Sequence, residues 1–233
     1  MLSALELEAL KLSAFIAVVA VLSSFIPGII IAWIISRKKG ILSSILNIIV
    51  YLPLVLPPVV IGYLLLILFS HNGFIGNFLY ENFNISVNFS WKGAAIASAV
   101  VSFPLLVRSI KLGFDTFDSK IEEAAYMSGA SKIDCFFSIT IPQILPSIIT
   151  GLTLAFARCL AEFGATITFV SNIPGETQTL PLALYTATQI PGTEQTALRL
   201  VIISVTLAFI SVAIAEVLAY RANKHIMGNR NNA

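Results

Sequence analysis

The sequence predicts an all-α integral membrane protein, and three observations carry this prediction. Hydrophobic residues make up 57% of the 233 residues and charged residues only 11%, whereas soluble domains carry about 25% charged residues. Long uncharged stretches such as Leu12–Ser36 match the roughly 20 residues that a helix needs to cross a bilayer. Basic side chains also gather in alternate loops, as they do in membrane proteins of fixed orientation.

Five segments are long and apolar enough to span the membrane, and we expect about five transmembrane helices. The first is a retained span rather than a signal peptide, since its apolar run is too long and no basic start precedes it. Pro57, Pro58 and Pro104 fall within spans, where proline either kinks a helix or marks a site whose freed carbonyls find other partners. We expect one membrane domain at 1–225 and a cytoplasmic tail at 226–233. The spans are predicted at 12–36, 48–70, 91–113, 146–170 and 199–220.

The loops differ strongly in their content of lysine and arginine. One side of the expected membrane holds only three lysines and arginines, Lys11, Lys92 and Arg199, against ten on the other side. The positive-inside rule therefore predicts an external N-terminus, a cytoplasmic C-terminus and a cytoplasmic connector at 114–145. The basic residues of the other side are Arg37, Lys38, Lys39, Arg108, Lys111, Lys120, Lys132, Arg221, Lys224 and Arg230.

The stretch Glu122–Gly151 is a polar, glycine- and proline-punctuated connector in an otherwise apolar chain. Ser119 and Glu122 have the spacing of a capping box that begins a helix, and Gly129 is suited to end it. A second short helix is expected to start at Ser131. The sequence thus predicts a cytoplasmic helix–turn–helix elbow, either a docking element or an amphipathic helix lying on the bilayer.

The spacing of particular residues in this connector favours the docking element over a helix lying on the bilayer. A glutamate–alanine–alanine triplet, a glycine four residues after it and a later Ile-x-Ile-Pro run resemble the EAA loop of permease subunits of ABC importers, with Ile141 where leucine is usual. The resemblance implies that an ATPase subunit docks here. The coupling residues that it implies are Glu122, Glu123, Ala124, Ala125, Gly129, Ile139, Ile141 and Pro142.

Two later segments narrow the resemblance. Phe156–Thr166 is similar to a segment of molybdate and sulfate permeases, with Ala161 where glycine is usual, and Asn172–Pro181 resembles an outer loop of the molybdate branch. The likeness covers roughly residues 10–220 and implies a type I ABC importer permease fold. It also implies a homodimer, a pair of ABC ATPase subunits, an extracytoplasmic molybdate-binding protein and an oxyanion substrate in the cell (plasma or inner) membrane.

The same resemblance implies that this chain binds no cofactor and that ATP and Mg²⁺ are held by the partner ATPase. The sequence contains no phosphate-binding G-x-x-x-x-G-K-[ST] loop, which agrees with a transport subunit without its own ATPase site. No metal site or nucleic-acid partner is expected. Cys135 and Cys159 lack metal-ligand spacing and are expected to be reduced thiols.

Arg158 and Glu162 are four residues apart in an expected span, which places them on one helix face. Each costs about 3 kcal/mol at a membrane centre, and pairing lowers that cost. The pair either lines or gates the anion route or braces the helix against a neighbour. Thr166 and Thr168 either offer hydroxyls to a passing oxyanion or contact another helix.

Other functions remain open from the sequence. A sulfate or thiosulfate ABC permease is the alternative within the same family, and molybdate is not distinguished from tungstate. A passive anion channel is disfavoured because a channel has no need for the connector. An intramembrane enzyme is disfavoured because both histidines, His71 and His225, lie outside the expected spans, and histidine is the commonest acid–base catalyst.

Overall fold

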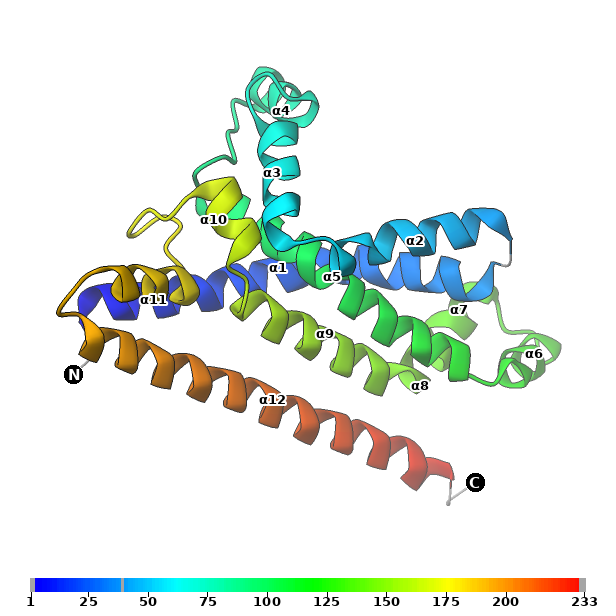
Figure 1. The fold of residues 1–233 in the computed structure, drawn as a ribbon. Helices are drawn as coiled ribbons and strands as arrows, with labels where there is room; N and C mark the ends of the chain where they lie inside the picture. The colour runs from blue at the N-terminus through cyan, green and yellow to red at the C-terminus, as the bar shows by residue number, and fades with distance from the viewer. Residues whose placement is uncertain (1–2, 39, 231–233) are drawn as a thin grey trace.

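The structure, a computed structural model, describes residues 3–38 and 40–230, and these form helices joined by turns, bends and irregular segments, with no strand among them. The long helices α1 and α12 run in the same direction along the bundle, and α3 and α4 project from one side of it (Figure 1). The elements are α1 (Ala4–Arg37), α2 (Ile41–Val55), α3 (Pro58–Phe69), α4 (Phe74–Phe83), α5 (Trp91–Thr116), α6 (Ser119–Met127), α7 (Lys132–Cys135), the π-helical turn η1 (Phe136–Thr140), α8 (Ile141–Gln143), α9 (Leu145–Leu160), α10 (Gly164–Val170), α11 (Leu180–Gln189) and α12 (Glu194–Arg230).

In the described part of the chain, three helices are each long and apolar enough to cross a membrane. They are α1, α5 and the Glu194–Arg221 part of α12. Two bent helix pairs raise the number to five if each pair is one span. The prediction of an all-helical chain is confirmed, and the observed three to five candidate spans agree with about five transmembrane helices. Which side faces the cytoplasm stays a prediction.

The second expected span, at 48–70, is not one continuous helix. The chain forms α2 and α3, which meet at an angle of 113°. Pro57 and Pro58 stand at the break; proline lacks an N–H donor, and the residue before it is driven out of the helical region. The break is thus a sharp bend rather than a mild kink.

The fourth expected span, at 146–170, is also interrupted. Helix α9 ends at Leu160 and α10 begins at Gly164. No proline lies between them; the Glu162 carboxylate in the break accepts the Ala165 N–H at the start of α10. Helix α10 packs against α3, and the two interrupted spans therefore meet close to their breaks.

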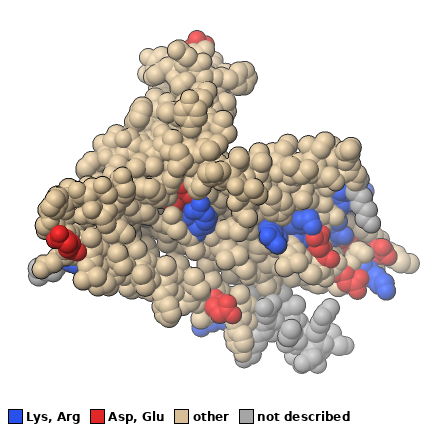
Figure 2. Space-filling model, in the orientation of Figure 1, with Lys and Arg blue, Asp and Glu red and all other residues tan. Residues whose placement is uncertain are grey.

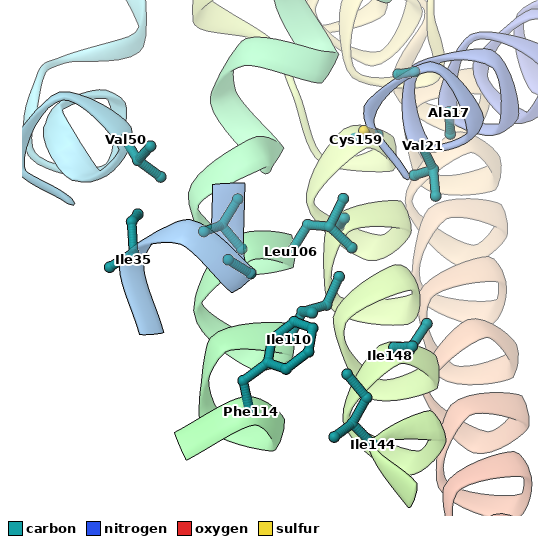
Figure 3. Packing of buried hydrophobic residues seen from close by; sticks show 14 residues of the cluster. Ala17, Val21, Ile35, Val50, Leu106, Ile110, Phe114, Ile144, Ile148 and Cys159 are labelled. Atoms are coloured by element: carbon teal, nitrogen blue, oxygen red, sulfur yellow. The ribbon is translucent and has the colours of Figure 1, made fainter. Parts of the chain in front are cut away.

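Helix α5 is the centre of the bundle, packed between α1 and α9. Figure 3 shows Leu106, Ile110 and Phe114 of α5 pointing toward Ile148 of α9 and Ile144, the N-cap residue of α9. All five are buried. Burying a large apolar side chain contributes about 1.5–3 kcal/mol relative to exposing it to water; between membrane helices, close van der Waals packing is the main gain. The α5–α9 pair is therefore a rigid unit.

Close approach of α3 and α10 depends on Gly62. A β-carbon at this position would lie 2.5 Å from the carbonyl oxygen of Ala165 and 2.9 Å from Cβ of Thr168. Both distances are shorter than real contacts allow, and the first obstacle is backbone, which has little freedom to move.

We expect Gly62→Ala to destabilise the protein by about 1–3 kcal/mol, the usual cost of overpacking, by forcing α3 away from α10. Thermal unfolding of the purified protein in detergent measures the effect. Val60→Ala, on a more exposed position of the same helix, is the control and should unfold near the wild-type temperature. Equal unfolding temperatures for Gly62→Ala and wild type would contradict the packing described.

The segments expected as outer loops contain two short helices, α4 and α11, which the sequence reasoning did not anticipate. At this end of the bundle, Arg199 Nε lies 3.0 Å from the buried Glu6 carboxylate. Glu6 also forms a capping box with Ser3. The pair joins the beginning of α1 to that of α12.

Helix α12 is longer than the last expected span, 199–220, and continues to Arg230. The expected span boundary and the expected cytoplasmic tail at 226–233 stay predictions, and residues 231–233 lie outside the described part.

Candidate coupling and translocation sites

The connector between α5 and α9 forms the predicted elbow, with α6 as its first limb and α7, η1 and α8 as its second. The predicted N-cap at Ser119 is wrong: Asp118 caps α6 by accepting a hydrogen bond from the Lys120 N–H at 3.0 Å. A carboxylate at the N-cap serves as well as a hydroxyl. The start of the helix shifts by one residue and its position in the chain is otherwise as expected.

Gly129 ends the first limb as predicted. Its φ is +92°, a conformation open to glycine and strained for other residues. The Gly129 N–H donates to the Tyr126 carbonyl, and the Ala130 N–H donates to the Ala125 carbonyl, both at 3.0 Å. These bonds satisfy carbonyls at the end of α6 and fix the turn between the limbs.

The second limb begins at Ser131, also as predicted. The Ser131 hydroxyl accepts from the Asp134 N–H at 3.2 Å. Cys135 and Thr140 are buried, which anchors this limb to the bundle. The buried, free Cys135 thiol fits the expected reduced cysteine.

Glu122 ties the elbow to the end of α1. Its Oε1 lies 2.9 Å from the Arg37 guanidinium and accepts a hydrogen bond from the buried Thr140 hydroxyl at 2.7 Å. One carboxylate thus joins α6, η1 and α1. The sequence reasoning included Glu122 but missed Arg37 and Thr140, because the three positions are far apart in the chain.

Beside this tie lies a groove of about 520 Å³ lined by Trp33, Arg37, Glu122, Tyr126, Lys132, Ile133, Phe136 and Phe137. Local desolvation, and then the neighbouring Cys135 and Glu122, raise the pKa of the Tyr126 phenol above its ordinary value. A raised pKa keeps this phenol neutral at physiological pH. Charged side chains gather at this end of the molecule (Figure 2).

The remaining candidate coupling residues differ in how far they are exposed to solvent. Glu123, Ala124 and Pro142 are exposed, whereas Ala125, Ile139 and Ile141 are half-buried. Three apolar side chains next to them are exposed as well, at 90% for Met127, 70% for Ile133 and 65% for Phe137. Exposed apolar side chains beside an acidic and small-residue surface are typical of a contact area for another protein.

Arg158 and Glu162 form the predicted pair, with Nη1 of the arginine 2.8 Å from Oε2 of the glutamate. Glu162 lies in the break after α9, where its side chain is 1% exposed against 29% for Arg158. The other carboxylate oxygen accepts the Ala165 N–H at 2.7 Å. Glu162 therefore stabilises the start of α10 while it neutralises the arginine.

Thr166 and Thr168 lie in α10 and differ in surroundings. The Thr168 hydroxyl donates to the Gly164 carbonyl of its own helix at 2.8 Å, and its Cβ faces Gly62. Thr166 is buried. The structure brings both threonines near the break in the fourth span, and it places the coupling residues at the other end of α9.

Solved structures share this arrangement of helices. A bacterial ABC transporter that imports alginate superposes with a TM-score of 0.74 at 17% identity, covering 94% of this chain and 80% of that chain. The MetNI methionine ABC transporter gives 0.72 at 13% identity, covering 94% and 96%. The fold is that of a membrane subunit of an ABC importer.

The family model described as "Binding-protein-dependent transport system inner membrane component" matches residues 13–224, and the chain belongs to this family. It is therefore a multi-pass inner-membrane transport subunit rather than an enzyme. It works in a transport system that depends on a binding protein, and the family carries no cofactor of its own.

Three relatives show that the sequence is more similar to molybdenum permeases than to a sulfate permease. The molybdenum transport system permease protein ModB of Haemophilus influenzae is 50% identical over 95% of this chain and 97% of its own length. ModB of Escherichia coli K12 is 53% identical over 92% and 93%. The sulfate transport system permease protein CysT of Salmonella typhimurium is 35% identical over 78% and 65%.

Proposed function

We propose that this chain is the permease subunit of an ATP-driven importer that carries molybdate into the cytoplasm. The observation that supports molybdate as the transported ion is the similarity to two ModB proteins, which are 50% and 53% identical to this chain over more than nine-tenths of each sequence. Two copies of this chain form the path, two ABC ATPase subunits drive it, and an extracytoplasmic molybdate-binding protein delivers the ion.

Sulfate or thiosulfate is the second candidate cargo. It is disfavoured because the likeness to CysT is weaker and covers only 65% of that protein. Tungstate is a tetrahedral dianion of nearly the same size as molybdate, so we assign the choice between these two ions to the binding protein. A passive channel is disfavoured because it has no use for an elbow with an exposed contact area.

The coupling role rests on the elbow. The ATPase docks against the surface that includes Glu123, Ala124 and Pro142, with the exposed Met127 and Phe137 as apolar contacts. ATP and Mg²⁺ are bound by the ATPase. When the two ATPase subunits close on ATP, they move the elbow of each permease copy.

The contacts inside the chain carry this movement onward. Glu122 links the elbow to α1 through Arg37, and the packed α5–α9 pair extends from the elbow to the break at Glu162. A rigid unit transmits a displacement at one end to the other. The permease and ATPases then share one two-state equilibrium, which ATP biases from the cytoplasmic side and the loaded binding protein from the outside.

A competition assay tests the cargo. The complete transporter is reconstituted in vesicles with binding protein and ATP, and uptake of labelled molybdate is measured against excess unlabelled molybdate, tungstate, sulfate or phosphate. We expect molybdate and tungstate to suppress uptake and sulfate to have little effect. Preferential uptake of labelled sulfate would overturn the assignment to molybdate and favour the CysT-like function.

A further inference from the structure

A second pocket, of about 440 Å³, opens between α2, α5 and α9. Its walls carry leucines, and its polar groups are Tyr51, Arg108, Ser109, Lys111, Asp115 and Thr150. Ser109 and Thr150 donate their hydroxyl protons to the carbonyls of Ser147 and Pro146. Lys111 is paired with Asp115, so the donors without a partner among the described residues are the Arg108 guanidinium and the Tyr51 hydroxyl.

Arg108 has an unusual position for a charged residue. It lies eight positions before the end of α5 at Thr116, which is about 12 Å along the helix axis. It is exposed, and it forms no ion pair with the side chains described at 3–38 and 40–221. A charge within a span costs free energy unless it faces a water-filled cavity or reaches the interface, and such charges commonly mark ion pathways.

The charges around the pocket leave it moderately positive. Lys111 pairs with Asp115, whose other oxygen accepts the Ser36 hydroxyl at 2.6 Å. Arg108 therefore supplies the one uncompensated charge among the polar groups that line the pocket. A guanidinium fork matches two oxygens of a tetrahedral oxyanion. A single such charge attracts a dianion yet permits its departure, as a conducting path requires.

The α9 wall of the pocket lies in line with the break in the fourth span. Thr150 and Leu154 line it from α9, and Arg158 follows one turn later on the same side of that helix. Figure 2 shows basic side chains following one another from the middle of the molecule toward the end where α6 lies. The break and the pocket are thus successive positions along one face.

We propose that this pocket is an oxyanion-binding site at the cytoplasmic end of the path, where Arg108 and Tyr51 hold the ion before its release. The proposal rests on the proposed function. The same groups would recognise any tetrahedral oxyanion, whether the transported ion or the phosphate of a lipid headgroup. We assign the transported ion, because the pocket lies in line with Arg158.

Product inhibition tests this site. The complete transporter is placed in phosphatidylcholine vesicles with its ATPase facing the bath, and the lumen holds binding protein with labelled molybdate. ATP-driven release is then measured against unlabelled molybdate added to the bath. Arg108→Gln should raise the half-inhibitory concentration about tenfold, as expected for one charge-assisted contact. Asp115→Asn should lower it several-fold, because it frees the charge of Lys111.

Lys38→Gln is the matched control, since this exposed cation lies on the same expected side and outside the pocket. It should leave inhibition unchanged. Equal inhibition in wild type, Arg108→Gln and Asp115→Asn would overturn the proposal. A second arm adds phosphatidylglycerol to the vesicles. If that lipid alters release only when Arg108 is present while bath molybdate inhibits every variant equally, the pocket holds a lipid phosphate. Wild-type vesicles that release no molybdate with ATP would instead contradict the proposed function.

Discussion

Replacing Gly129 with proline is expected to abolish coupling while the chain still inserts and folds. Gly129 has a φ of +92° and donates its N–H to the Tyr126 carbonyl at 3.0 Å. Proline is locked near −65° and has no N–H, so the turn between the two limbs of the elbow must change shape. The ATPase would then meet a displaced surface. Uptake and binding-protein-stimulated ATP hydrolysis should both fall about tenfold or more, within the usual range of coupling energies.

Gly129→Asn is the matched control for this change, because asparagine tolerates the left-handed conformation and keeps the N–H. It should retain most of the wild-type stimulation. Apart from its chain neighbours, nothing lies within 4 Å of a β-carbon built at this position, so neither variant should clash with the membrane helices. Thermal unfolding of both variants measures whether those helices remain intact. Wild-type stimulation in Gly129→Pro would refute the docking role of the elbow.

Loss of Glu162 is expected to be the most damaging single change near the path. Glu162→Ala leaves the Arg158 charge without its partner and the Ala165 N–H without its acceptor. Breaking a buried ion pair on one side costs about 3–5 kcal/mol. We expect poor membrane insertion or a much lower unfolding temperature, together with loss of uptake.

A double variant separates the bracing role from the path role. Arg158→Gln with Glu162→Gln removes both charges and keeps an acceptor for Ala165, so the unfolding temperature should recover. If the half-buried Arg158 guanidinium contacts the passing anion, as we propose, uptake should stay well below the wild-type rate in this variant. A stable double variant with wild-type uptake would show that the pair only braces the break.

Much of the elbow was predictable because its signals are local. The Gly129 stop and the Ser131 cap each depend on a few neighbouring residues, and both are observed. The first cap was misplaced because Asp118 and Ser119 are both good capping residues and adjacent. Local sequence does not decide which of the two leaves the helix.

The broken spans were harder to foresee. A hydropathy window averages across Pro57 and Pro58, so it reports one apolar segment where two helices meet at 113°. At the other break only part of the cause is local: the Glu162 carboxylate accepts the Ala165 N–H at the start of α10, but α10 also packs against α3 at Gly62, which is far away in the chain. Contacts between distant residues, such as Arg37 with Glu122, leave no trace in periodicity or spacing.

We propose that closure of the ATPase subunits on ATP, passed through the elbow, drives molybdate across the membrane. The most direct test of this proposal is accumulation of labelled molybdate on the ATPase side of sealed vesicles that contain the whole transporter and its binding protein. We predict a concentration above that of the opposite side with ATP, and none with a non-hydrolysable analogue. Movement that stops at equal concentrations and proceeds at the same rate without ATP would contradict the account.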